Sequence, residues 1–302
     1  MVQSLSQVGL FLFLIVLGNR LKHIGMFHAK EAKTLSKIAL NVTLPAAIVA
    51  SFNTFSMDYS LLILILYGII ANLVLMCLSY FVNRKQDNAI RTYALFNGST
   101  YNVGNFSFPF VQALFGPSAL VASSLFDLGN ALMTTGFIYS LGSSIAGGQR
   151  PSVKDLSKKL FTSVPFIAYL VMITLSFASI RLPSFLQEWM QAIGKANPII
   201  AMLMVGFMLE IRFERSWMHH TLRLLSIRYG MAILFSYYFY SFTAFSPVIK
   251  TALILAVFAP VSSISVAYTE QVTDQGRLSS FTSSLSVIIS IACYAFLAPL
   301  LA

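Results

Sequence analysis

The chain has 302 residues, of which 57% are hydrophobic and only 10% are charged. Soluble domains average about 25% charged residues, so this composition excludes a soluble globular protein and predicts an all-α polytopic membrane protein in a lipid bilayer. The net charge of +10 lies in short loops between apolar runs. This pattern is typical of a membrane protein and not of a nucleic-acid-binding surface, so we expect no nucleic acid partner.

Ten apolar runs are long enough to cross about 30 Å of hydrocarbon as helices, and we number these predicted spans 1 to 10 in chain order. They cover residues 5–21, 33–54, 59–82, 92–115, 118–142, 160–180, 185–209, 224–243, 249–270 and 278–301. The first run follows neither the positively charged start nor the cleavage pattern of a signal peptide, so we expect it to remain as a span.

Basic residues fall almost entirely on one side of the predicted spans. Of the 20 Lys and Arg, 17 lie in the loops or span ends after spans 1, 3, 5, 7 and 9. They are Arg20, Lys22, Lys30, Lys33, Lys37, Arg84, Lys85, Arg91, Arg150, Lys154, Lys158, Lys159, Arg212, Arg215, Arg223, Arg228 and Arg277. Because such residues accumulate in the cytoplasm, we predict cytoplasmic odd-numbered loops, extracellular termini and a multi-pass protein of the cell membrane.

Prolines recur at matching positions in the two halves of the chain. Pro45 and Pro198 are 153 residues apart, and Pro109 and Pro260 are 151 residues apart. Each pair falls in corresponding members of two five-span units, and an odd number of spans makes the second unit enter the membrane from the opposite side. The sequence therefore predicts two inverted repeats and a cytoplasmic linker. Their predicted ranges are 1–142, 160–302 and, for the linker, 143–159.

Span 4 contains an unusually polar stretch, Asn97–Pro109, with two Gly, three Asn and a Pro in 13 residues. Gly and Pro break helices, and a break at membrane depth is tolerated only where protein buries it or a water-filled cavity adjoins it. Span 9 has a similar break at Pro260. Matched broken segments are where secondary transporters bind their cargo, so we predict that spans 4 and 9 cross at their breaks. The alternative is a proline kink that only helps helices to pack.

The predicted crossing brings neutral polar side chains to the middle of the membrane. Half-helix N-termini carry partial positive charge, which favours an anionic group such as a substrate carboxylate. The predicted substrate-binding residues are Asn41, Thr43, Asn102, Gly104, Asn105, Ser262, Ser263 and Ser265. The predicted helix breaks lie at Pro45, Pro109, Pro198 and Pro260. The alternative for the serines is a hydrogen bond to the preceding turn of their own helix.

Asp127 lies deep inside span 5, with Asn130 one turn further along. An acidic side chain at that depth costs roughly 3 kcal/mol, so such residues face the protein interior and mark function. We predict that Asp127 and Asn130 serve a coupling ion, H⁺ or Na⁺; the alternative is that Asp127 bonds a broken helix. We found no metal-ligand spacing and no catalytic or cofactor motif, so we predict no metal site, no other cofactor and no enzyme activity.

Several motifs resemble the auxin efflux carrier family, which includes plant auxin exporters and bacterial transporters described as malate permeases. The stretch Asn102–Pro109 resembles that family's Asn-Thr-Gly-Asn-Phe-Gly-x-Pro motif, although Val103 replaces its Thr and Ser107 its Gly. Supporting matches are Leu44-Pro45, Asp127-Leu128-Gly129-Asn130, Asn197-Pro198 and Ala259-Pro260. Because of the two departures, auxin specificity is not part of the resemblance.

The resemblance implies two inverted five-helix units like those of sodium/proton antiporters and bile acid symporters. It also implies a scaffold domain of spans 1, 2, 6 and 7, a transport domain of spans 3–5 and 8–10, and an organic anion held near Asn102. A homodimer through the scaffold domain is a further expectation. We predict a secondary transporter working by elevator-type or rocking alternating access. The alternatives are a sodium-coupled symporter of the bile acid type and a membrane sensor without transport.

Overall fold

The computed structural model of the chain describes residues 2–27, 29–148, 151–209 and 214–301. Within these residues the chain forms helices and no strand. Six helices of this described part, counted through their π-helical turns, are long and apolar enough to cross a membrane, or seven if the bent pair α8–α9 is one span. The chain is therefore a multi-pass membrane protein. Arg150 and Arg212, counted above as cytoplasmic charges, lie outside the described residues.

The first half of the chain forms seven α-helices joined in places by short π-helical or 3₁₀ turns. The elements are α1 (Val2–His23), α2 (Ala29–Ile38), η1 (Ala39–Thr43), α3 (Leu44–Thr54), η2 (Tyr59–Leu62), α4 (Ile63–Val82), α5 (Asn88–Gly98), η3 (Val103–Ser107), α6 (Phe108–Leu132), η4 (Met133–Ile138) and α7 (Tyr139–Ile145). Inside α6, Gly116 has φ 75° and ψ −166°, which divides the helix between predicted spans 4 and 5.

The second half of the chain contains eight α-helices. They are α8 (Val153–Phe161), α9 (Val164–Phe177), α10 (Ser184–Gly194), α11 (Asn197–Met208), α12 (Arg215–Phe242), α13 (Pro247–Val257), α14 (Ser263–Val272) and α15 (Gly276–Leu301). The linker predicted over 143–159 thus contains most of α8. The predicted start of span 6 at residue 160 falls in the last turn of α8, and the chain bends by 77° between α8 and α9. Pro165 lies in the first turn of α9. It could not continue α8 as a regular helix, because proline has no N–H to donate and its ring would clash with the carbonyl oxygen of Phe161.

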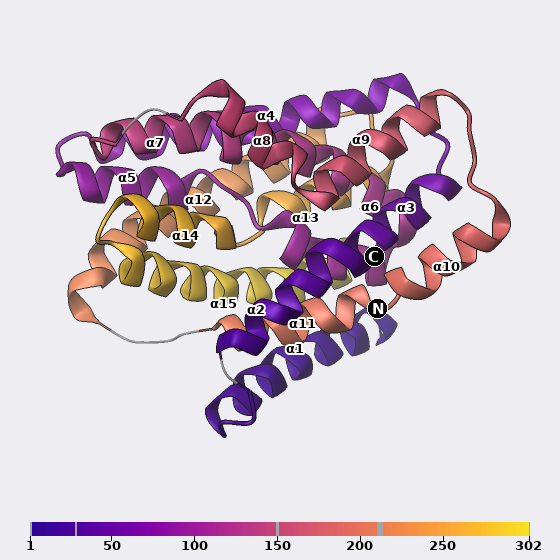
Figure 1. Ribbon diagram of the computed structural model, residues 1–302, viewed down its shortest axis with the longest axis horizontal. Coiled ribbons are helices and arrows are strands. Elements are labelled where there is room, and N and C mark those ends of the chain that lie inside the picture. The colour runs from indigo at the N-terminus through magenta and orange to yellow at the C-terminus, as the bar shows by residue number, and fades with distance from the viewer. Residues whose placement is uncertain (1, 28, 149–150, 210–213, 302) are drawn as a thin grey trace.

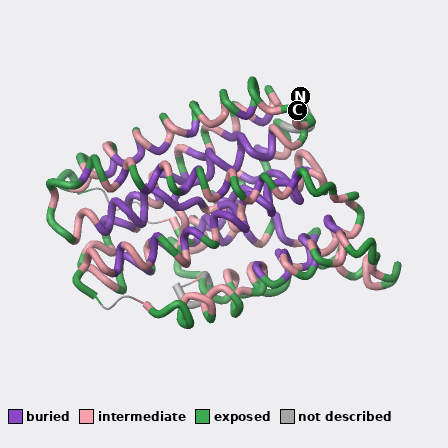
Figure 2. The backbone as a smooth tube through the Cα atoms, turned by 90° about the horizontal axis from the view of Figure 1, so that it is seen from above, coloured by how far each residue is buried: buried purple, intermediate pink, exposed green. Residues whose placement is uncertain are grey.

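The helices pack in two groups (Figure 1). In the α11 group, α1 and α2 pack on α11, and α3 packs on α9 and α10. In the α13 group, α13 packs on α6 and α12, α4 and α7 pack on α5, and α14 packs on α5 and α15. Contacts of α6 with α3 and α11 join the two groups. The two termini lie close together in both views (Figures 1 and 2).

Glycines allow close helix contacts in both groups. A Cβ atom on Gly206 would lie 2.2 Å from the Ile15 carbonyl oxygen, where α11 meets α1. A Cβ atom on Gly129 would lie 2.1 Å from the Ile65 carbonyl oxygen, where α6 meets α4. Membrane helices have little hydrophobic driving force between them, so close van der Waals packing over small residues supplies much of their association.

Large apolar side chains remain exposed on the outer surface. Figure 2 shows the buried residues running through the middle of the molecule, with exposed residues around them. Phe13, Ile233 and Phe296 each expose 60% or more of their surface. A soluble protein rarely tolerates large apolar patches, but a lipid-facing surface requires them.

Candidate functional site

The breaks in predicted spans 4 and 9 contact each other. Residues 99–102 separate α5 from η3, and residues 258–262 separate α13 from α14. The backbone N–H of Asn102 donates a hydrogen bond to the Pro260 carbonyl oxygen at 2.9 Å. Since α5 packs on α14 and α6 packs on α13, the first half of each broken segment lies beside the second half of the other. The two segments therefore run in opposite directions past the point where both lose helical structure.

Asn130 pairs the backbone of the first break. Its side-chain oxygen accepts a hydrogen bond from the Tyr101 N–H at 3.1 Å, and its side-chain NH₂ donates to the Tyr101 carbonyl oxygen at 2.9 Å. One carboxamide thus replaces both helical partners that Tyr101 lacks. Each unpaired backbone group at membrane depth costs several kcal/mol, so Asn130 stabilises the non-helical conformation.

Arg228 of α12 lies at the same junction and is fully buried. Its Nη2 atom donates to the carbonyl oxygens of Ala259 at 2.8 Å and Pro260 at 3.0 Å, and Nη1 donates to the Gly98 carbonyl oxygen at 3.4 Å. These carbonyls follow the C-terminal ends of α5 and α13, where the helix dipole places partial negative charge. The guanidinium also lies 4.4 Å from the centre of the Tyr101 ring, within cation–π range.

The assignment of Arg228 to the cytoplasmic loop charges is therefore wrong. The residue lies four positions inside predicted span 8, and charged residues inside a span are normally functional or paired. That rule, applied above to Asp127, was a sequence signal for Arg228 as well. Arg228 is instead a buried cation that bonds the ends of both broken segments.

Asp127 lies beside the first break and connects it to the α11 group. Its Oδ1 atom accepts a hydrogen bond from the Asn130 side chain at 2.8 Å, and Oδ2 accepts one from the Tyr169 hydroxyl of α9 at 3.0 Å. A Cβ atom on Gly104 would lie 3.6 Å from the same Oδ2 atom, so this carboxylate contacts the start of η3. Both hydrogen-bond donors are neutral. The role of Asp127 in ion coupling stays a prediction.

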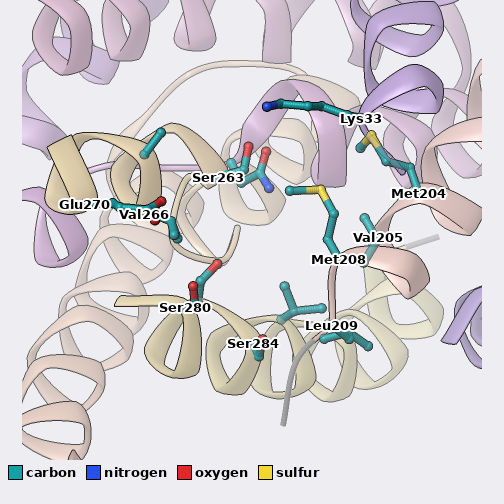
Figure 3. A pocket seen from close by; sticks show the side chains of 14 residues that line it. Lys33, Met204, Val205, Met208, Leu209, Ser263, Val266, Glu270, Ser280 and Ser284 are labelled. Atoms are coloured by element: carbon teal, nitrogen blue, oxygen red, sulfur yellow. The ribbon is translucent and has the colours of Figure 1, made fainter. Parts of the chain in front are cut away.

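A cavity of about 310 Å³ adjoins the junction and lies between the two helix groups (Figure 3). Its walls come from α2 and α11 on one side, and from the first break, α14 and α15 on the other. The lining residues are Lys33, Asn102, Met204, Val205, Met208, Leu209, Ser263, Val266, Ala267, Glu270, Ser280, Ser283, Ser284 and Val287. The cavity thus combines an apolar wall from α11 with hydroxyl groups from α14 and α15, and it contains one basic and one acidic side chain.

Two helix starts open onto this cavity. Asn102 precedes η3 and the continuous helix α6, and its side chain makes no capping bond. Ser262 precedes α14 and also makes no side-chain capping bond, while the next residue, Ser263, lines the cavity. Uncapped helix N-termini present backbone N–H groups and partial positive charge, which is the arrangement that favours an anion.

The predicted binding residues divide into those at the cavity and those outside it. Asn102 and Ser263 line the cavity, whereas Gly104 and Asn105 lie in η3 and Ser262 lies just before the lining residues. Ser265 is buried, and its hydroxyl shares a 2.6 Å hydrogen bond with Thr100. Of the residues predicted in spans 4 and 9, the structure therefore places two on the cavity wall and the others outside its lining.

Asn41 and Thr43 of the η1 turn lie away from the cavity. The Asn41 side chain is exposed and donates to the Lys37 carbonyl oxygen at 2.9 Å. The Thr43 hydroxyl donates to the Asn197 side chain at 3.0 Å and links η1 to α11. Both residues therefore serve local structure in the α11 group in this conformation.

The four predicted helix breaks differ in form. Pro260 lies within the gap between α13 and α14, while Pro109 and Pro198 lie in the first turns of α6 and α11. Pro45 lies in the first turn of α3, but the chain stays helical through the π-helical turn η1. The wider turn accommodates the missing N–H of proline, so Pro45 produces a local distortion and not a gap.

Comparisons with known proteins point to the class of function. Residues 5–149 match the model of a family described as "Membrane transport protein". The chain resembles membrane transporters. It is also 27% identical over 215 residues to an uncharacterized transporter from Methanothermobacter thermautotrophicus, and the match covers 68% of this chain and 67% of that relative. Both findings support a transporter, a class of protein that is generally not enzymatic. The family match includes the first break, and the second break lies beyond it.

Sequence reasoning missed several lining residues. Ser280, Ser283 and Ser284 lie on α15, and the serine-rich run 279–286 in an otherwise apolar span was a usable signal. Lys33 was counted only as a charge of a loop or span end. Nothing in the sequence alone indicated that α2, α11 and α15 would surround the break.

Proposed function

We propose that this protein is a secondary transporter that moves a small organic anion across the cell membrane, of the auxin efflux carrier type that the Asn102–Pro109 motif resembles. The observation that carries the proposal is the cavity of about 310 Å³ beside two uncapped helix starts. A carrier of small carboxylates like the bacterial malate permeases is the form that best fits so small a cavity, since drug-sized ligand sites begin at about 300 Å³.

The chemistry of the cavity suits a carboxylate. Asn102 can donate its side-chain amide hydrogens, and hydroxyl groups from α14 and α15 provide further neutral donors. Lys33 lines the same cavity, and its ammonium group supplies positive charge there (Figure 3). Glu270 lies at another side of the cavity and is the one lining group that would repel an anion, so we assign the bound position to the Asn102 side.

In this proposal the chain crosses the membrane ten times as two inverted five-helix repeats. The antiparallel arrangement of the two broken segments supports the inversion. Lys33 begins predicted span 2 and Glu270 ends predicted span 9, and the charge bias assigns both positions to the cytoplasmic side. The cavity then opens to the cytoplasm, and both termini face the outside.

The position of the cavity supports alternating access. One wall belongs to the α11 group and the other to the α13 group, so a shift of one group against the other would close the opening. The α11 group corresponds to the scaffold domain expected from spans 1, 2, 6 and 7, through which we propose homodimer formation. The α13 group corresponds to the transport domain. An elevator-type or rocking movement of the second group would carry the anion past the first.

Asp127 is the group that we propose couples transport to an ion. Its carboxylate accepts hydrogen bonds from Asn130, which pairs the backbone of the first break, and from the Tyr169 hydroxyl of the opposite group. Binding of H⁺ or Na⁺ at Asp127 would change that contact and thereby the relative stability of the two arrangements. A carrier driven by membrane potential, without an ion site, would not depend on Asp127.

The test is uptake of labelled mono- and dicarboxylates by the purified protein in lipid vesicles, with imposed pH, Na⁺ or voltage gradients. Replacing Asn102 by Ala should reduce uptake of the best substrate about ten- to a hundredfold, because a hydrogen bond to a charged group contributes about 1.5–3 kcal/mol. Asn41→Ala is the matched control, since the Asn41 amide lies outside the cavity and bonds only a local carbonyl.

The outcomes separate the proposal from its rivals. Wild-type uptake of no carboxylate under any gradient would overturn the assignment to organic anions. Equal uptake by the Asn102→Ala and wild-type proteins would remove the cavity from the transport path. Uptake that requires Na⁺ would favour a sodium-coupled symporter of the bile acid type.

A further inference from the structure

A second pocket, of about 500 Å³, lies between the end of α4, the loop that follows it and Arg223 of α12, and it shares no lining residue with the transport cavity. It is shallow and is lined by Phe81, Val82, Arg84, Lys85, Gln86 and Arg223. Half of these residues are basic, and none is acidic. The pocket therefore offers a strongly positive surface formed by two helices that contact each other.

The apolar residues of this pocket lie at the end of predicted span 3, where the edge of the membrane is expected. Phe81 and Val82 are the last residues of α4 and of predicted span 3, and they expose 61% and 45% of their surfaces. Arg223 immediately precedes predicted span 8. Arg84 and Lys85 follow in the exposed loop after α4. An apolar rim on the membrane side and cations on the aqueous side match the two parts of a phospholipid.

The charges around the pocket are incompletely balanced. The nearby Asp87 carboxylate caps α5 by accepting the Ile90 N–H at 2.9 Å. The Arg223 guanidinium donates a hydrogen bond to His219 Nε2 at 2.8 Å, and a ring nitrogen that accepts carries no positive or negative charge. Burial, and then the charges of His219 and Arg223, lower the pKa of His220, and Asp87 opposes this only in part. The pocket lining holds three basic residues and no acidic residue, so the pocket is positively charged, as an anion site requires.

We propose that this pocket binds the headgroup phosphate of an anionic phospholipid, with Arg84, Lys85 and Arg223 contacting the phosphate oxygens. Arginine matches phosphate geometry through paired N–H donors, and basic pockets between membrane helices bind anionic headgroups. Phe81 and Val82 contact the ester and acyl region. A soluble phosphate shares the charge but has nothing to place against these two apolar side chains. The site is independent of the transported anion.

The experiment measures retention and affinity of phosphatidylglycerol on the purified protein, by native mass spectrometry and by titration in neutral detergent. Phosphatidylcholine, which has no net charge, and inorganic phosphate are the comparison ligands. The test variant carries Arg84→Gln, Lys85→Gln and Arg223→Gln. The control variant carries Arg20→Gln, Lys154→Gln and Lys158→Gln, which removes the same charge from exposed positions elsewhere on the same predicted side.

The pocket variant should bind phosphatidylglycerol about tenfold or more weakly, while the control changes by less than about twofold. Phe81→Gln should weaken phosphatidylglycerol binding and leave the response to inorganic phosphate unchanged. Three results would each overturn the proposal: unchanged binding in the pocket variant, equal loss in both triple variants, or displacement of the lipid by millimolar inorganic phosphate. A thermal unfolding curve for each variant distinguishes a loss of lipid binding from a loss of fold.

Discussion

Replacing Arg228 by Met removes the cation that bonds the ends of both broken helices. The Ala259 carbonyl, bonded at 2.8 Å, loses this donor and remains buried, which costs about 1–3 kcal/mol. The Pro260 carbonyl loses a 3.0 Å bond but keeps the Asn102 N–H, so its cost is nearer 1 kcal/mol. Met has no charge to desolvate on folding, and the absence of that cost offsets part of the loss of stability. The net loss of stability should therefore be about 2–3 kcal/mol.

The assay is denaturant-induced unfolding of the purified protein in mixed micelles, with Arg228→Met, Arg228→Lys and the exposed-site control Arg215→Met. Lysine keeps the charge but has a single, compact ammonium group in place of the planar fork, so its variant should fall between the Met variant and the wild type. The control should unfold with the wild type, within about 0.5 kcal/mol. An Arg228→Met protein as stable as the control would refute the reasoning that this side chain holds the two breaks.

Three further changes test the junction and the helix packing. Asn130→Asp keeps the shape of the side chain but loses the donor to the Tyr101 carbonyl and places a carboxyl group beside Asp127, so stability should fall by about 2 kcal/mol in the same unfolding assay. Asp127→Asn should abolish the pH or Na⁺ dependence of vesicle uptake, and an unchanged dependence would make this residue structural. Gly206→Ala should destabilise the fold by about 1–3 kcal/mol and lower the melting temperature, because the added Cβ would lie 2.2 Å from a backbone oxygen. Gly9→Ala is the control and should leave the melting temperature unchanged, since no atom lies within 4 Å of its added Cβ.

Hydropathy and proline positions were sufficient to locate most of the helical segments. Each predicted range contains helix, and Gly116 divides α6 where the boundary between spans 4 and 5 was expected. These features depend on local sequence alone. An apolar run of membrane length forms a helix, and a Gly-Pro pair interrupts the helix in which it lies. The same local reasoning did not predict the bend of 77° between α8 and α9, where Pro165 lies in the first turn of the second helix.

The cavity wall was harder to predict because it depends on contacts between distant parts of the chain. Asn102 was expected from its place in a polar break, but its neighbours across the cavity come from α2, α11 and α15. The hydrophobic pattern of each helix shows which residues avoid water, and lipid satisfies that preference as well as protein does. The pattern therefore does not identify the partner helix. Close glycine contacts such as Gly206 on Ile15 select it.

Charge compensation at the junction supports the proposal that the transported molecule is an anion. A broken helix has two ends of opposite polarity at the break, and only the negative ends have a protein side chain as partner. The buried Arg228 guanidinium donates to carbonyl oxygens at the C-terminal ends of α5 and α13 and compensates their partial negative charge. The starts after Asn102 and Ser262 lack a side-chain cap and face the cavity, so their partial positive charge is left for a bound molecule. A cation carrier would need the reverse arrangement, with capped helix starts and carbonyl ends open to the cavity.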